Sequence, residues 1–335
     1  MLLGRSTGSG PAVVALGGGH GLSASLSALR LMTDRLTAVV TVADDGGSSG
    51  RLRDEMDVLP PGDLRMALSA LCDDSDWGRT WRDVLQHRFH TDGSMDNHAV
   101  GNLLIVALWE LLGDPVSGLD WVGRLLGARG RVLPMASVPL AIEADILEPR
   151  TGTNGPPADG EVLRVVRGQS AVAVAPGRIA EVRLLPDDPP ACPEAVQAVD
   201  SADWVVLGPG SWFTSVMPHL LVPELSAALH RTKARRCVTL NIRPVTDRQG
   251  MTCFEHLQAL QHHAPDLRVD VVIADPSTID DVSAMHEQAA GMGAHLLLRQ
   301  VQVGDGTARH DALRLAAAYR DAFEGFLGDV GTSAR

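Results

Sequence analysis

Two glycine-rich segments near the amino terminus each follow a short run of apolar residues. Gly17–Ser23 comes after the apolar run Ala12–Leu16, and Asp44–Gly50 comes after Leu36–Val42. Unbroken apolar runs of this length are typical of buried strands. Between the two strands, Leu22–Leu31 carries apolar residues at helical spacing. Because a strand, a turn, a helix and a second strand follow in that order, the sequence predicts parallel strands joined by a right-handed crossover.

The first glycine segment predicts a phosphate-binding turn. Glycines let the backbone approach a ligand, and the helix that begins directly behind the turn aims its N–H groups at an anion. The spacing is neither a Walker loop nor the dinucleotide fingerprint G-x-G-x-x-G, whose third glycine position falls on Leu22. The alternative is a tight strand–helix junction without a ligand. The expected contact residues are Gly17, Gly18, Gly19, His20, Gly21 and Leu22.

Asp44 and Asp45 follow the second strand, at the edge where a doubly wound sheet binds ligands. Either carboxylate could hold a ribose hydroxyl, and the pair could instead hold Mg²⁺, with Asp45 as the expected metal ligand. The alternative is that one of them caps the next turn. Asp63, further on, is expected to cap a helix that runs through Cys72. The residues expected to supply donors and charge in a second glycine turn are Gly46, Gly47, Ser48, Ser49 and Arg51.

A third glycine turn, Gly208–Ser215, follows the apolar run Trp204–Leu207. Its N–H groups and hydroxyls could cradle a phosphate or a sugar, or the turn could only cap a helix. Asn102 opens the segment Asn102–Leu112, which is apolar on nearly all sides and predicts a buried helix. The Asn102 amide could bond a base or ribose, or serve the core. The contacts expected in the third turn are Gly208, Gly210, Ser211 and Thr214.

The segment Arg131–Pro186 differs in pattern from the rest of the chain. Its short β-like runs are broken by glycine and proline, which predicts a β-rich insertion. Around it, residues 11–330 alternate strand and helix patterns. They predict a single α/β nucleotide-binding domain with a doubly wound, mostly parallel, Rossmann-like sheet. Residues 1–10 are expected to form a flexible tail.

The formal net charge of −12 over 335 residues argues against nucleic acid as a partner. The four cysteines form no C-x-x-C pair and predict free thiols in a reducing compartment. No apolar run of about 18 residues and no signal-peptide pattern occurs, so we expect a cytoplasmic protein without a membrane span. No nucleophile elbow or local Ser/His/Asp signature is present, which leaves Asp44 and Asp45 as the catalytic candidates if the protein is an enzyme.

The run Asp44–Arg53, followed by Pro60–Asp63, resembles the bacterial gluconeogenesis factor family (YvcK-like). That family belongs to the superfamily of the 2-phospho-L-lactate transferase (CofD) of coenzyme F420 synthesis. The resemblance extends over roughly residues 12–300. Two departures from the family's pattern are His20, where many members have Thr, and Arg243–Thr252, which lacks the usual Gln and Glu. Further matching stretches are Gly17–Ser23, Gln86–Phe89, Gly101–Leu103, Gly130–Pro134, Gly208–Ser211 and Pro218–Pro223.

The resemblance implies a regulatory protein that binds a nucleotide sugar such as UDP-N-acetylglucosamine. It implies a role in cell shape and envelope synthesis on gluconeogenic carbon sources, with a protein partner in wall precursor synthesis, and it leaves a homo-oligomer open. The alternative is a transferase that moves a phospholactyl group from a nucleoside diphosphate to a hydroxyl acceptor. In that branch of the superfamily the residues matching Asp44 and Asp45 would hold the acceptor and Mg²⁺. A dehydrogenase is a weaker third alternative.

Overall fold

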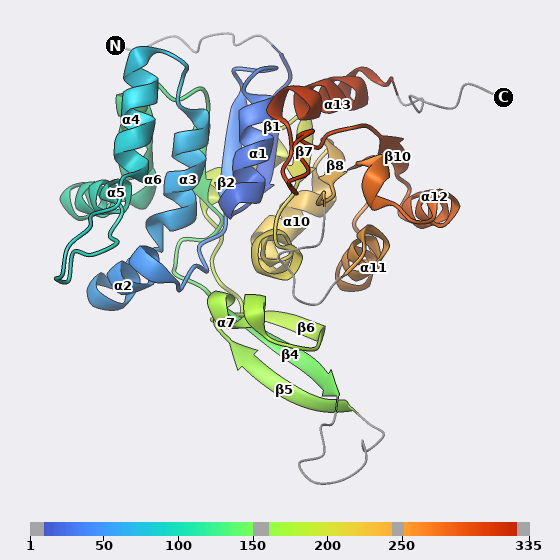
Figure 1. The fold of residues 1–335 in the computed structure, drawn as a ribbon, viewed down its shortest axis with the longest axis horizontal. Helices are drawn as coiled ribbons and strands as arrows, with labels where there is room; N and C mark the ends of the chain where they lie inside the picture. The colour runs from blue at the N-terminus through green and yellow to red at the C-terminus, as the bar shows by residue number, and fades with distance from the viewer. Residues whose placement is uncertain (1–9, 150–160, 243–250, 327–335) are drawn as a thin grey trace.

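A seven-stranded sheet forms the centre of the protein (Figure 1). The computed structural model describes residues 10–149, 161–242 and 251–326. Neighbouring strands of this sheet pair in parallel, in the order β10-β9-β8-β7-β1-β2-β3. Apolar residues fill these strands because a sheet covered by helices on both faces is buried on both. The strands are β1 (Val13–Gly17), β2 (Leu36–Val40), β3 (Arg131–Pro134), β7 (Trp204–Leu207), β8 (Arg235–Thr239), β9 (Val271–Ala274) and β10 (His295–Leu298).

The helix α1 (Gly19–Leu29) packs between α3 (Pro61–Leu71) and α13 (Ala312–Glu324), as Figure 1 shows. Helix α3 also contacts α4 (Asp76–Gln86) and α5 (Val100–Leu112). Helix α1 therefore contacts both β1 and the last helix, α13. The other α-helices around the main sheet, within the described residues, are α2 (Gly47–Met56), α6 (Pro115–Leu126), α8 (Pro193–Asp200), α9 (Pro218–Leu221), α10 (Pro223–Arg231), α11 (Cys253–His263) and α12 (Val282–Gly291).

The order of the strands reverses at β1. From β1 the chain builds β2 and β3 on one side, and it later returns to place β7 on the other side. Residue Leu16 is level with Leu207 of β7, and Gly17 is level with Val40 of β2. The carboxyl ends of these three strands therefore lie side by side. Such a switch point is where open α/β sheets bind their ligands. The strand order also confirms the expected doubly wound, mostly parallel fold.

A second sheet of three antiparallel strands projects from the main body at the bottom of Figure 1. It consists of β4 (Ala141–Pro149), β5 (Glu161–Arg167) and β6 (Arg178–Leu185), with the short helix α7 (Gln169–Val174) between β5 and β6. The insertion therefore begins later than Arg131, because β3 pairs with β2 at the edge of the main sheet. The β-like runs of the sequence at Val138–Ile146, Leu163–Val166 and Ile179–Leu184 overlap the three strands of this sheet.

Three local expectations differ from the structure. The segment after Asp45 is not a turn, because Gly47–Met56 forms helix α2 with Gly46 at its N-cap. Asp63 does not cap α3, which begins at Pro61 with Pro60 as N-cap, since proline is preorganised for a first helical position. Helix α5 is not buried all round, because it packs by one face and leaves Leu111 78% exposed.

Some expectations concern residues that the structure does not describe. The tail before Gly10 and positions 243–250, which hold most of the segment that departs from the family's pattern, lie outside the described residues. Within the described parts, no helix is both long enough and apolar enough to cross a membrane. The four cysteines are buried free thiols.

Candidate functional site

The turns that follow β1 and β7 touch each other through their backbones. A Cβ atom at Gly21 would lie 2.2 Å from the carbonyl oxygen of Pro209 and 2.4 Å from the Cα of Gly210. A side chain at position 21 is therefore excluded by the neighbouring turn, whatever the site binds. The first and third glycine turns of the sequence form one continuous backbone surface at the switch point.

The turn after β1 also contacts the end of β2 and the start of α3. A Cβ atom at Gly18 would lie 2.4 Å from Oδ2 of Asp63 and 2.5 Å from Cγ2 of Thr41. We call this region the strand-end site. It consists of Gly17–Gly21, Thr41–Asp45, Asp63 and Gly208–Ser211.

The protein's own carboxylate occupies the helix N-terminus that the sequence assigned to a phosphate. Gly19, whose φ of +56° favours glycine, begins α1 and donates its N–H to Asp63. The residues His20, Gly21 and Leu22 follow within the first turn of α1. A phosphate at this helix end would therefore lie next to the Asp63 carboxyl group, which makes the charge of that group decisive.

Burial raises the pKa of Asp63 to about 7, and the charge of Asp44 adds to the increase. The side chain is only 9% exposed, and its Oδ2 atom has no hydrogen-bond partner among the described residues. Burial also raises the pKa of Asp44, against hydrogen bonds from Gly46 and Ser49 that lower it. Two neighbouring carboxyl groups with raised pKa values are typical of a functional site.

Arg65 lies two residues beyond Asp63 on α3 and is 4% exposed. Burial lowers its pKa to about 10, and the charge of Arg88 lowers it further, whereas Asp63 and Asp44 act in the opposite direction. The sequence pattern alone assigns neither Asp63 nor Arg65 to the site. Pro60–Asp63 belongs to the run that carries the family resemblance, but a carboxylate near a helix start also has the pattern of an N-cap.

The neighbours Asp44 and Asp45 have different environments. Asp44 is half-buried, and its Oδ1 accepts a hydrogen bond of 3.0 Å from Gly46 N. Asp45 is exposed, and its Oδ1 accepts a hydrogen bond of 2.9 Å from Ser170 N at the start of α7. A Cβ at Gly168 would lie 2.3 Å from the other Asp45 carboxylate oxygen. The Asp45 carboxylate therefore holds the insertion against the main domain.

The two serines of α2 are 2% exposed and use their hydroxyls inside the protein. The Ser49 hydroxyl accepts a 2.6 Å hydrogen bond from Gly62 N and donates to Asp44, so it joins α2, α3 and the strand-end site. The Ser48 hydroxyl lies 3.0 Å from Nδ2 of Asn102. Ser48 and Ser49, both expected to contact a ligand, thus use their hydroxyls to connect elements around the site.

Asn102 and Arg51 also have partners within the protein. Asn102 is 1% exposed, and its Oδ1 has no hydrogen-bond partner in the described part of the chain. Arg51 donates to the carbonyl oxygens of Ser94 (3.0 Å) and Asp96 (2.6 Å) in an exposed loop. The structure therefore joins Asn102 to α2 through Ser48 and directs the Arg51 guanidinium to that loop.

A residue absent from the sequence analysis, Asn241, holds the third turn. Its Oδ1 accepts from Gly210 N, and its Nδ2 donates to Gly210 O, both at 2.9 Å. The amide of Gly210 is therefore already bonded, in contrast to its expected role as a phosphate donor. The Thr214 hydroxyl donates to that of Ser211 at 2.6 Å.

The acids of the strand-end site set a limit on metal binding. Among the described residues, no group of three or more His, Cys, Asp or Glu side chains is arranged to hold a metal ion. Asp44 and Asp63 provide two carboxyl groups that interact electrostatically. Mg²⁺ keeps several waters and is commonly bound by one or two carboxylates plus phosphate oxygens, so these two residues fit the ion better than Asp45 does.

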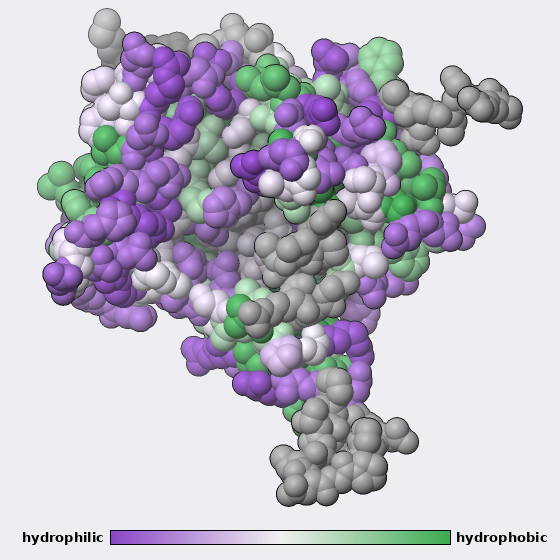
Figure 2. Space-filling view, in the orientation of Figure 1, coloured by the Kyte–Doolittle hydropathy of each residue, from purple (hydrophilic) through white to green (hydrophobic). Residues whose placement is uncertain are grey.

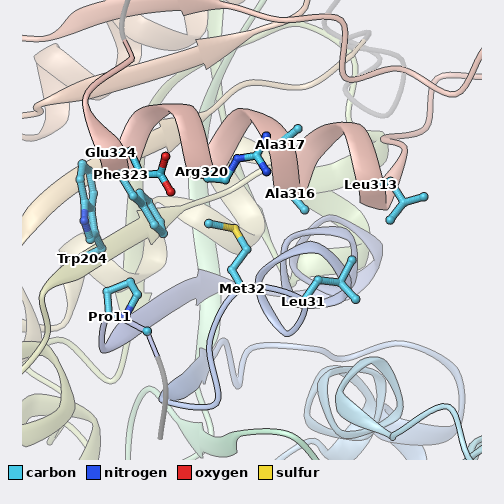
Figure 3. A pocket seen from close by; sticks show the side chains of 11 residues that line it. Pro11, Leu31, Met32, Trp204, Leu313, Ala316, Ala317, Arg320, Phe323 and Glu324 are labelled. Atoms are coloured by element: carbon cyan, nitrogen blue, oxygen red, sulfur yellow. The ribbon is translucent and has the colours of Figure 1, made fainter.

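An apolar groove of about 610 Å³ lies at the opposite edge of the sheet (Figure 3). Figure 3 shows Trp204, at the start of β7, and Phe323, on α13, with Met32 facing them. The rings of Trp204 and Phe323 stack with 4.4 Å between centroids. Because Trp204 is at the amino end of β7 and Gly208 follows its carboxyl end, this groove is separate from the strand-end site.

A sequence model of the 2-phospho-L-lactate transferase CofD family matches residues 13–305. The fold and this match thus define an α/β protein of the CofD class. The chain belongs to the gluconeogenesis factors (YvcK-like) within that class, as its curated relatives show.

Relatives align over most of the chain. A protein of Mycobacterium tuberculosis, provisionally named a gluconeogenesis factor, is 51% identical over 310 residues, which cover 91% of this chain and 88% of that protein. The gluconeogenesis factor of Listeria monocytogenes is 33% identical over 320 residues, with 92% and 94% covered. A crystal structure of a UPF0052 family member from Bacillus halodurans matches with a TM-score of 0.79 and 32% identity, covering 92% of this chain and 98% of that one. The family resemblance and the fold expected from the sequence are thereby confirmed.

Proposed function

We propose that the protein is a regulatory protein that binds a nucleotide sugar of the UDP-N-acetylglucosamine type at the strand-end site. The observation that carries the proposal is the contact between Gly21 and the turn Pro209–Gly210. It joins two strand-end turns into one backbone surface at the switch point, where α/β sheets bind nucleotides. The chain's membership of the gluconeogenesis factors supports a regulatory rather than a biosynthetic role.

The raised pKa values explain how an acidic site accepts a phosphorylated ligand. When Asp63 is protonated, its hydroxyl donates to a ligand oxygen instead of repelling it. When it is ionised, Asp63 and Asp44 would hold Mg²⁺, which supplies positive charge between the carboxylates and the phosphates. Asp44, half-buried beside Gly46, is placed to accept from sugar or ribose hydroxyls.

The cellular part of the proposal concerns cell shape and envelope synthesis on gluconeogenic carbon sources. The protein would report the level of its nucleotide sugar to a protein partner in wall precursor synthesis, in the cytoplasm. A ligand that binds one conformation of the protein more tightly than another would shift the population toward that conformation. If the two conformations differ in the contacts between the turns, the surface that the partner meets would change. The insertion held by Asp45 and Ser170 is the described element whose position depends most directly on the strand-end site.

A phospholactate transferase is the second candidate, and the Asp63 side chain favours it. A group whose pKa is about 7 suits a general base at neutral pH. In this scheme Asp63 takes the proton of the acceptor hydroxyl while the hydroxyl oxygen bonds to the phosphorus of the phospholactyl group. The bond from that phosphorus to the nucleoside monophosphate breaks at the same time. The remaining chemistry is positioning and charge neutralisation.

Calorimetry with UDP-N-acetylglucosamine, GDP and NAD, each with and without Mg²⁺, tests the proposal. We expect the uridine nucleotide to bind, and Asp44→Asn to weaken its binding by about tenfold to a hundredfold, as loss of a charged hydrogen-bond acceptor does. The matched control is Asp54→Asn, an exposed acid on α2, which should bind like the wild type. Binding of GDP without binding of the uridine nucleotide would overturn the regulatory proposal in favour of the transferase.

A further inference from the structure

A groove of about 610 Å³ runs between α1, α3 and α4. Four arginines line it: Arg30 just after α1, Arg65 from α3, Arg82 from α4 and Arg88 just beyond α4. We call it the arginine groove. In Figure 2 the surface over α3 and α4 is strongly hydrophilic. The groove reaches the strand-end site at His20, which lies in the first turn of α1.

The positive charge of the groove is only partly neutralised. Arg30 forms an ion pair of 2.9 Å with Asp74, and Arg82 lies 3.6 Å from the same carboxylate. Arg65 and Arg88 form no ion pair within 4 Å in the part of the chain that the structure describes. Among the described lining residues, Asp83 is the one acid. One shared carboxylate and one exposed acid thus face four guanidinium groups.

The hydrogen bonds of the two unpaired arginines go to neutral oxygens. Arg65 donates to Oε1 of Gln86 and, at 3.5 Å, to the carbonyl oxygen of Leu85. Arg88 donates to the carbonyl oxygen of Asn97 at 2.8 Å. Such bonds orient a guanidinium without cancelling its charge. Asp63 and Asp44 act on Arg65 electrostatically, but among the described residues no acid contacts either guanidinium group within 4 Å.

Three buried donors on the same groove have no acceptor. Within the described residues, Nε of Arg30, Nε of Arg65 and Oγ of Ser69 are buried without a hydrogen-bond partner. All three residues line the arginine groove. Buried donors are nearly always satisfied in native proteins, so an exception calls for an acceptor that the chain itself does not supply. Small side-chain shifts on binding, which are common, would bring such donors to a ligand.

We propose that the arginine groove is a second anion-binding site, which takes a phosphorylated small molecule beside the occupant of the strand-end site. Guanidinium groups match phosphate oxygens in pairs and stay charged on burial more readily than an ammonium group. The volume lies in the range of small-molecule sites. A nucleic acid is disfavoured by the net charge of −12. The proposal stands whatever the strand-end site binds.

Inorganic pyrophosphate is the probe, and isothermal calorimetry on the full chain is the measurement. Arg88→Gln is expected to weaken pyrophosphate binding at least tenfold, and Arg88→Lys, which keeps the charge, by less. Asp83→Asn removes the lining acid and is expected to tighten binding twofold or more. The matched control is Arg309→Gln, an exposed arginine paired with Asp305 away from the groove. Equal affinity of the Arg88→Gln and Arg309→Gln variants would overturn the proposal.

A competition experiment separates this site from the strand-end site. With UDP-N-acetylglucosamine in excess, one equivalent of pyrophosphate should still bind and should still depend on Arg88. Complete displacement of pyrophosphate by the nucleotide sugar would overturn the proposal, because it would reveal one shared site. If the nucleotide sugar does not bind at all, the proposed function fails, whereas the difference between the Arg88 and Arg309 variants remains a test of the groove. Thermal unfolding of each variant checks that the comparison is made between folded proteins.

Discussion

The strand-end site and the arginine groove have opposite charges and share one helix. Asp63 and Arg65 both belong to the first two turns of α3. Asp63 faces the Gly19 amide and interacts electrostatically with Asp44, whereas Arg65 lines the groove with three other arginines. No direct ion pair between Asp63 and Arg65 forms within 4 Å among the described residues. The protein thus keeps two buried, opposite charges apart although they lie close in the sequence.

The separation indicates that neither charge gains stability from an ion pair with the other. A buried charge without an ion-pair partner is costly to desolvate. The pKa values agree, because that of Asp63 is raised to about 7 and that of Arg65 is lowered to about 10, with burial as the main cause in both. Features that cost stability are expected where a ligand later supplies the missing partner.

The largest effect is expected from Asp63→Asn. With a folded pKa of about 7 against an ordinary value of 3.8, native Asp63 binds a proton that the unfolded chain releases between these two pH values. The free energy of unfolding of the wild type should therefore fall as pH rises from 4 to 7, by about 4 kcal/mol. The variant should match the wild type near pH 4 and exceed its stability at pH 8, since an amide can still accept from Gly19.

Urea unfolding at pH 4, 6 and 8 measures this difference, and Asp54→Asn provides the control. The exposed control variant should follow the wild type at every pH. If Asp63→Asn and wild type lose stability in parallel between pH 4 and 8, then Asp63 is not the group that titrates. In that case burial of the Asp63 carboxylate does not lower the free energy of unfolding, and this acid behaves like an exposed one.

A smaller but still large effect is expected from Gly21→Ala. The new Cβ would meet the Pro209 carbonyl oxygen at 2.2 Å, so the turns after β1 and β7 must separate. We expect a loss of about 3 kcal/mol in the free energy of unfolding, the upper end for overpacked positions. Gly47→Ala is the control, because Gly47 has a φ of +50° but open space around it, and only backbone strain of about 1 kcal/mol applies. An equal loss of free energy of unfolding in the two variants would show that the turns after β1 and β7 can move apart at little cost.

Tyr319→Phe tests the support beneath the strand-end site. The Tyr319 hydroxyl lies 2.7 Å from that of Ser25 and 2.9 Å from that of Thr239, and Ser25 donates to the Gly208 carbonyl oxygen at 2.8 Å. Loss of the phenol leaves buried hydroxyls with fewer partners, at a cost of about 1 to 2 kcal/mol. Chemical unfolding of Tyr319→Phe, Ser25→Ala and the double variant measures the coupling. Additive losses would mean that the network does not act as a unit.

The positions of the strand-end turns could be predicted because an apolar run stops where its strand ends. Trp204–Leu207 matches β7, and the turn after it lies where the sequence placed it. Parallel strands end at a common edge, so the turns after β1 and β7 had to meet. The insertion was visible for the same reason, since glycines and prolines separate its strands from the flanking helices.

Other features depend on contacts that no local pattern reveals. Glycine disfavours helices, yet Gly47–Met56 is helical. Gly50 is required within it, because a Cβ there would meet the Asp45 carbonyl oxygen at 2.2 Å. The role of Asp63 depends on Gly19, which is distant in the sequence. The arginine groove was hidden because arginines on several helices have the pattern of an ordinary solvated surface.

The smallest effect is expected from Asp45→Asn. The carboxylate was predicted to contact the ligand or Mg²⁺, and it accepts a hydrogen bond from Ser170 N in an exposed position. If its role is to hold the insertion, stability should fall by about 1 kcal/mol or less, as for loss of a capping carboxylate. Nucleotide affinity measured by calorimetry should change less than in Asp44→Asn. An equal loss of affinity in both variants would show that the insertion and the strand-end site bind the ligand together, and that Asp45 belongs to the site as the sequence predicted.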